Sequence, residues 1–201
     1  MQNSIDNQTF SKWRTLNIAK KKVNENKSRT LPQLQQRARW QKAIDLDDLF
    51  ELSSEIGFPS RPATLDYHNA FLKANANEKV IAVSDDLEVT VNYEAILCAK
   101  GRRKLPHTFS VTADGENQTL TFTHSTEARG SKRDKTDELY AMVVAPELED
   151  AELFELGTRT DSEPVTVTLP EGWDVNSVEV YVFALSADGT KASNSLHLTV
   201  E

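Results

Sequence analysis

Cysteine, glycine and long apolar runs are all scarce in this sequence of 201 residues. The single cysteine, Cys98, excludes an intrachain disulfide framework. With seven glycines and no P-loop, G-x-G-x-x-G or G-x-S-x-G pattern, phosphate-cradling loops and nucleophile elbows of these types are excluded. No run approaches the roughly 18 apolar residues of a membrane span, and residues 1–10 lack the apolar core of a secretory signal. We therefore expect a protein of the cytoplasm, or a component of a virion or other assembly.

Residue types that catalyse reactions or bind metals are present, but they form no recognised arrangement. None of the four histidines is spaced three or four residues from another or stands beside a second cysteine, which excludes zinc sites of finger or metalloprotease type. Carboxylate pairs such as Asp47 and Asp48 are adjacent in sequence, so their side chains point apart. Cys98 lies in a predicted apolar strand, AILCA, where we expect a buried, inert thiol. We expect no catalytic, cofactor-binding or metal-binding residues, and a protein that is not an enzyme.

Charge is distributed unevenly along the chain, whose formal net charge is −8. Residues 1–42 contain ten Lys or Arg and two acids, a net of about +8, so the other 159 residues, with 13 bases and 29 acids, carry about −16. Such asymmetry favours contact between the basic region and an acidic partner. That partner is either nucleic acid or the acidic body of a neighbouring copy, unless the region is a solvated extension without a partner.

The first half of the chain is predicted to contain a basic extended arm over 1–29 and a helical segment over 30–79. Residues 1–29 sustain no hydrophobic period, so we expect this region not to fold by itself. Thr30 to Gln33 form a helix start, and Gly57 with Pro59 a stop, so a helix is expected between them, or two helices meeting near Asp45. A further helix is expected over 63–78.

From Val80 the apolar residues alternate with period two, which predicts connecting strands over 80–104 and a β-sandwich over 105–201. Seven strand candidates lie in the sandwich region: HTFSVTA, QTLTFTH, LYAMVVAP, ELFELGT, PVTVTLP, VEVYVFAL and SLHLTV. The last two are predicted to form a hairpin with a two-residue turn at Asp188 and Gly189. The predicted fold class is α+β, with an N-terminal arm and a small helical segment followed by an immunoglobulin- or fibronectin-type-III-like antiparallel sandwich.

Several phrases occur in an order that resembles a known family: Trp13 with Arg29 downstream, TLPQLQQRARW, IGF, YHNAFLKANANE, VNYEAILCAKGRRKLP, DELYAMVVAP, VTLPEGW and VYVFALSADGTKASNS. Together they resemble an uncharacterised family of unknown function that is common in Bacteroidetes. Members usually begin with a glycine-rich stretch, whereas residues 1–12 of this chain contain no glycine. The resemblance implies a C-terminal fibronectin- or immunoglobulin-like sandwich ending in SADGTKASNS, and it implies no activity.

Our leading hypothesis is a non-enzymatic structural protein that self-assembles, with the arm of one copy lying on the acidic sandwich of the next. The partners would then be further copies or other assembly subunits. The arm residues that we expect to make this contact are Trp13, Arg14, Lys20, Lys21, Lys22 and Arg29.

Two other hypotheses remain open. The first is a binding module that grips a protein or a glycan through sandwich loops 102–107 and 125–138. The second, less favoured, is nucleic-acid contact through the arm, because Trp13 and Trp40 both lie within basic sequence. The alternative for Trp40 is packing on Phe71 or on the sandwich.

Overall fold

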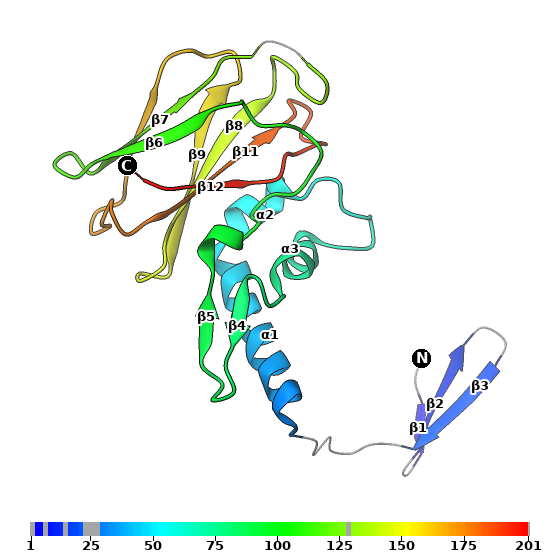
Figure 1. Cartoon of the computed structure of the whole chain (residues 1–201). Coiled ribbons are helices and arrows are strands. Elements are labelled where there is room, and N and C mark those ends of the chain that lie inside the picture. The colour runs from blue at the N-terminus through cyan, green and yellow to red at the C-terminus, as the bar shows by residue number, and fades with distance from the viewer. Residues whose placement is uncertain (1–2, 6–7, 14–15, 22–28, 128–129, 201) are drawn as a thin grey trace. The chain divides into compact units, whose positions relative to one another are not determined.

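In the computed structural model the described residues are 3–5, 8–13, 16–21, 29–127 and 130–200. The chain divides into two compact units, Met1–Leu34 and Gln35–Glu201, and each is described by itself. The predicted α+β fold class is confirmed: helices accompany antiparallel sheets in a sandwich-like arrangement (Figure 1).

The N-terminal unit contains strands β1 (Asn3–Ile5), β2 (Gln8–Trp13) and β3 (Leu16–Lys21). They form an antiparallel sheet in the order β1-β2-β3. The register places Trp13 opposite Leu16, and Thr9 opposite Lys20. Where the sequence predicted an extended arm without sustained period, the described residues are therefore paired strands. Backbone pairing needs no apolar period, which explains why hydrophobic pattern alone did not find this sheet.

Three helices follow: α1 (Leu31–Leu49), α2 (Glu51–Gly57) and α3 (Tyr67–Asn75). The start near Thr30 and the stop at Gly57 agree with the prediction, and the chain is divided into two helices at Phe50, five residues beyond Asp45. The helix predicted over 63–78 is shorter, because the Asp66 carboxylate accepts a hydrogen bond from the Asn69 backbone N–H at 2.7 Å and so caps a helix that begins at Tyr67.

The segment 80–104 contains one short hairpin, β4 (Ile81–Val83) with β5 (Val89–Val91), followed by the 3₁₀ turn η1 (Tyr93–Ala95). The prediction of a strand over AILCA was wrong, because residues 95–99 form no strand. Their backbone bonds to side chains instead of to a neighbouring strand: Leu97 N–H donates to Asn75 Oδ1, and Cys98 N–H donates to Ser195 Oγ. Two polar side chains therefore replace the ladder that a strand requires.

All seven predicted strands of the sandwich are confirmed: β6 (Phe109–Asp114), β7 (Thr119–His124), β8 (Glu138–Ala145), β9 (Asp150–Thr158), β10 (Val165–Thr168), β11 (Glu179–Leu185) and β12 (Leu196–Leu198). One sheet has the order β10-β7-β6 and the other the order β12-β11-β8-β9.

The central strands of the larger sheet, β8 and β11, are buried on both faces, because the helices cover the side that faces away from β6 and β7. Alternate residues of β11 enter different cores. Val180 and Val182 belong to the core inside the sandwich, whereas Tyr181 and Phe183 belong to the core beneath the helices. Phe50, between α1 and α2, packs edge-on against Tyr181 with ring centroids 5.2 Å apart. Residues 35–79, 80–104 and 105–201 therefore contribute to one continuous body in three layers (Figure 1).

Candidate functional site

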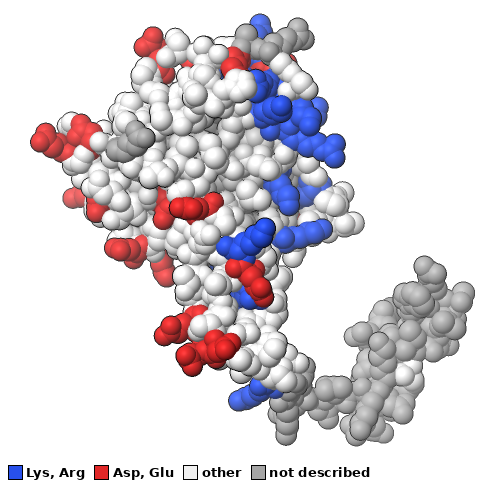
Figure 2. All heavy atoms as spheres, in the orientation of Figure 1, with Lys and Arg blue, Asp and Glu red and all other residues white. Residues whose placement is uncertain are grey.

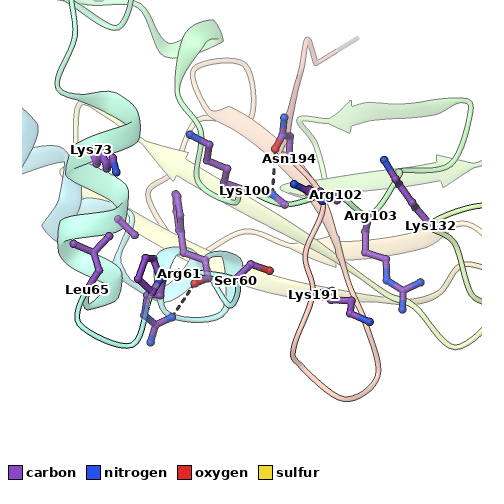
Figure 3. Close-up of a pocket in the computed structure, with 14 residues that line it drawn as sticks. Ser60, Arg61, Leu65, Lys73, Lys100, Arg102, Arg103, Lys132, Lys191 and Asn194 are labelled. Carbon is purple, nitrogen blue, oxygen red and sulfur yellow. Dashed lines mark hydrogen bonds between the residues drawn. The ribbon is translucent and has the colours of Figure 1, made fainter.

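A pocket of about 810 Å³ opens on the Gln35–Glu201 unit, beside α3 and two chain segments that are far apart in sequence (Figure 3). Residues from the loop after α2 and from α3 give it an apolar wall, formed by Phe58, Pro62, Leu65 and Ala70. Segments 100–103 and 191–194 form the opposite wall together with Lys132. Its volume lies within the range of about 300–1,000 Å³ in which small organic ligands bind.

Close backbone contacts hold segment 98–103 in place beside the pocket. Lys100 N–H donates to the carbonyl of Gly57 at 2.8 Å, and Arg103 N–H donates to the carbonyl of Ala192 at 2.9 Å. Gly101 lies so close to Ala192 that a Cβ at Gly101 would stand 1.9 Å from the Ala192 carbonyl oxygen. The absence of a side chain at Gly101 therefore allows the two segments to meet and aligns their basic residues on one wall.

The turn between β11 and β12 carries Lys191 to the pocket. Ser186 N–H donates to the Lys191 carbonyl at 2.8 Å, so four residues lie between them instead of the two predicted. Gly189 has the expected positive φ, +67°. The Asp188 carboxylate accepts hydrogen bonds from Ser186 Oγ at 2.6 Å and from Thr190 N–H, and these bonds lower its pKa below the ordinary value. The longer turn is thus organised by a side chain that stays ionised.

The pocket is positively charged, whereas the chain as a whole is negatively charged. Segment 100–103 contributes Lys100, Arg102 and Arg103, and Lys132 and Lys191 lie on the same wall. The other wall carries two more bases, one in the loop before α3 and one on α3: Arg61 and Lys73. Among the described residues that line the pocket none is acidic. Figure 2 shows Lys and Arg gathered along one side of this unit, with Asp and Glu gathered mainly elsewhere on the visible face.

The two half-buried arginines of the pocket are held in position. Arg61 Nη1 donates to the Phe58 carbonyl at 2.9 Å, and its guanidinium lies 5.9 Å from the centre of the Tyr67 ring. Arg103 Nη2 lies 3.3 Å from Asp137 Oδ1. The lysines are exposed, and no ion pair joins them to a carboxylate within 29–127 and 130–200. The site thus combines fixed guanidinium groups with freely orienting ammonium groups.

Behind Arg103 lies a buried cluster of ionised side chains. Arg159 is fully buried, as is Asp137, and their Nη2 and Oδ2 atoms lie 3.5 Å apart. Glu127 Oε2 lies 3.5 Å from Arg159 Nη1 and 2.7 Å from Arg133 Nη1. Burial lowers the pKa of Arg159, and the charges of Asp137 and Glu127 oppose this effect. Arg159 Nη2 also donates to the Lys104 carbonyl, which ties the basic loop to the end of the sandwich.

The residues that the sequence singled out for an assembly contact belong to the N-terminal unit. Trp13 ends β2, and Lys20 and Lys21 end β3. Arg29 is exposed, whereas Arg14 and Lys22 lie outside the described residues. The backbone register sets Lys20 and Lys21 opposite Thr9 and Gln8, and it sets Trp13 apart from them at the other end of the strand pair. Their role as a contact remains a prediction.

The histidines do not converge on the pocket. Three of them approach a carboxylate: His68 Nδ1 lies 2.8 Å from Asp47 Oδ2, His197 Nε2 lies 2.6 Å from Glu179 Oε2, and His107 Nε2 lies 3.4 Å from Glu127 Oε1. None of these histidines lines the pocket. Within the described part of the chain no three His, Cys, Asp or Glu side chains gather as a metal site would require.

The two tryptophans of the second unit have different environments. Trp40 is 45% exposed, so it does not pack into either core as one reading of the sequence suggested. Trp173 is 4% exposed and belongs to the core of the sandwich.

Cys98 is buried as expected, although outside a strand, and burial raises the pKa of its thiol to about 12. Because the thiolate is the reactive form, we expect iodoacetamide to alkylate Cys98 of the folded protein at pH 8 at least about 100-fold more slowly than the urea-unfolded chain. Intact mass over time measures both rates. Similar rates in the two states would contradict the buried position of Cys98.

The pocket was not predicted from the sequence, although its parts lie within phrases that carried the family resemblance. CAKGRRKLP contains Lys100, Gly101, Arg102 and Arg103, and SADGTKASNS contains Lys191 and Asn194. Loop 102–107 is predicted from the sequence as a candidate binding loop, but no pattern in the sequence predicts that Arg102 and Arg103 meet residues 191–194. The signal that could have indicated the pocket is that both phrases combine small residues, which allow close contact between segments, with basic residues.

Fold and pocket together define an α+β protein in which a helical layer and a sandwich share a basic pocket. The chain belongs to a family of unknown function, DUF6266, whose model matches residues 1–199. No curated protein and no solved structure matches the chain. Among the described residues no helix has the length and apolar character needed to cross a membrane.

Proposed function

We propose that this protein is a non-enzymatic structural protein that self-assembles through its N-terminal strands, as a component of a virion-like or other large assembly. The supporting observation is that the two units have sheet edges of opposite charge, one basic and the other acidic. Strand β3 is at one edge of the N-terminal sheet, and it ends in Lys20 and Lys21. Strand β9 is at one edge of the larger sheet of the sandwich, and it is acidic.

The acidic edge is well defined. Strand β9 and the turn before it contain five acids and no base over residues 146–156: Glu147, Glu149, Asp150, Glu152 and Glu155. Asp150 and Glu155 are exposed. Within the described strands β9 pairs only with β8, so its other side offers backbone groups to an added strand. The addition of an edge strand is a common way in which one chain recognises another.

The basic edge has an unpaired side. Among the described strands β3 pairs only with β2, so its other side offers backbone groups to an added strand. Pairing β3 of one copy with β9 of the next would satisfy both edges. Lys20 and Lys21, with Lys22 beyond the strand, would lie near the acids, while Trp13, Arg14 and Arg29 would contribute further contacts. Because this contact joins different surfaces, repetition produces rings or filaments.

Charge reversal tests this proposal. We expect Lys20→Glu with Lys21→Glu, and separately Asp150→Lys with Glu155→Lys, to weaken self-association of the full chain at least tenfold, and the four changes together to restore it in part. Light scattering after size exclusion at several protein and salt concentrations measures the association. Lys79→Glu with Lys135→Glu is the matched control, since both lysines are exposed and the charge change is equal. A chain that is monomeric at every concentration contradicts the proposal.

A second candidate function is a binding module that uses the sandwich loops. The observation in its favour is that Lys104 N–H donates to the Lys132 carbonyl at 3.2 Å, which joins loop 102–107 to loop 125–138. Both loops contribute bases to the pocket. This candidate predicts a monomer, so the light-scattering experiment distinguishes the two. Nucleic-acid contact through the arm, a cytoplasmic or virion location and occurrence in Bacteroidetes stay predictions.

A further inference from the structure

We propose that the basic pocket binds a small organic phosphate, a molecule with two or more phosphate groups and an apolar or ring portion of nucleotide size. The inference concerns the Gln35–Glu201 unit alone and does not depend on assembly through the N-terminal strands. It rests on three properties of the pocket: the sign and density of its charge, the fixed position of its arginines and its apolar wall.

The positive charge of the pocket favours a multiply charged anion as its ligand. Seven Lys and Arg side chains line one pocket of a chain whose formal net charge is −8. Like charges that are brought together repel one another, so this arrangement disfavours the empty protein. An anion with several charges replaces repulsion with attraction at each base, whereas a singly charged carboxylate would offset only one or two of them.

The arginines favour phosphate over other anions. Arg61 and Arg103 are held by the Phe58 carbonyl and by Asp137, so little conformational freedom remains to be lost on binding. A planar guanidinium matches two oxygens of one phosphate group. Lys100 and Lys191 act as mobile point charges that adapt to the remaining oxygens (Figure 3). Two oriented guanidinium groups and several ammonium groups suit two or more linked phosphates.

The apolar wall requires that the ligand is more than inorganic phosphate. Leu65 is half-buried and Pro62 is exposed, and both line the pocket on the side of Arg61. A ring or hydrocarbon portion that covers them is removed from water, which favours binding in proportion to the apolar surface buried. A phosphate ester with such a portion would use both walls.

A nucleic-acid strand fits the pocket less well. Single strands bind along grooves in which exposed aromatic rings stack on successive bases. The aromatic residue among the described lining residues is Phe58, which is 4% exposed and belongs to the core beneath the helices. Exposed Trp40 is not among the lining residues of the pocket. The pocket therefore offers charge and volume without a stacking surface for a polymer.

Isothermal titration of the full chain in 50 mM NaCl tests the inference with adenosine triphosphate and inorganic tripolyphosphate as probes. We expect one site for adenosine triphosphate, with at least fivefold tighter binding than tripolyphosphate. Lys100→Glu with Lys191→Glu should weaken binding of adenosine triphosphate at least tenfold. The control Arg37→Glu with Lys79→Glu has the same charge change at two exposed residues that do not line the pocket, and it should stay within about twofold of the parent protein.

Each other result overturns the inference. Equal weakening in the control would mean that bulk charge, and not the pocket, attracts the probe. Equal affinity for the two probes would show that the pocket does not recognise the organic portion of the ligand. Tighter binding of hexaglutamate, or of a single-stranded 20-mer, that is lost in the Lys100 and Lys191 variant would reassign the pocket to an acidic peptide or to nucleic acid. Self-association of these variants, measured separately, distinguishes failure here from failure of the assembly proposal.

Discussion

Arg159→Met is expected to lower the free energy of unfolding by about 3–5 kcal/mol, because it takes the shared cation away from the buried Asp137 carboxylate and the half-buried Glu127 carboxylate. Arg159 and Asp137 are both fully buried, and Glu127 lies within 3.5 Å of the same guanidinium. The substitution also removes the hydrogen bond to the Lys104 carbonyl. Urea unfolding at pH 7, followed by the fluorescence of the chain's tryptophans, measures the loss, since Trp173 is buried in the sandwich.

A second variant separates the lost charge from the lost volume. Arg159→Met combined with Asp137→Asn also removes the charge of the buried carboxylate, which in Arg159→Met keeps only the contact with Arg103, and we expect the double variant to be more stable than Arg159→Met alone. Because the two residues are in contact, their effects should not add. A loss below about 1 kcal/mol for Arg159→Met would show that the cluster does not hold the end of the sandwich together.

Gly101→Ala is expected to destabilise the protein by about 1–3 kcal/mol or more, the usual effect of forcing atoms into a filled space. Its Cβ would stand 1.9 Å from the Ala192 carbonyl oxygen, and this oxygen accepts the hydrogen bond of Arg103 N–H. The clash must separate segment 98–103 from segment 191–195. Urea unfolding measures the stability, and titration with adenosine triphosphate should show weaker binding because Lys100 and Lys191 move apart.

Gly115→Ala provides the matched control for this prediction. A Cβ at Gly115 would meet only Val175 Cγ2, at an ordinary contact distance of 3.8 Å. We expect its stability to change by no more than about 0.5 kcal/mol. If the two variants were equally stable, the close approach of the two segments at Gly101 would be refuted.

The sandwich could be predicted in detail because each of its strands carries a local signal. In β11 the residues on both faces of the strand are mainly apolar. This pattern is local, because it depends only on successive side chains pointing to opposite faces of a strand. The helix stop at Gly57 is equally local, since it follows from one glycine and a proline two residues later. The strand expected at Cys98 failed, because Asn75 and Ser195, both distant in sequence, take its backbone hydrogen bonds.

The pocket could not be predicted because its charge is assembled from separate segments. Arg61 precedes α3, Lys73 belongs to α3, and Lys132 and Lys191 come from different loops of the sandwich. In the sequence each of these bases reads as an ordinary solvated side chain. Only the packing of the helices on the larger sheet brings them to the same place.

The sequence by itself determined the identity of most helices and strands, the opposite charges of the two ends of the chain and the absence of recognised catalytic motifs. These properties depend on neighbours along the chain, or on simple counts. The tertiary structure alone decided that the helical layer and the sandwich share a core, and that an acidic chain gathers seven bases around one pocket. Such contacts join residues separated by more than 130 positions, as in the ring contact between Phe50 and Tyr181, and over such a separation no local pattern carries information.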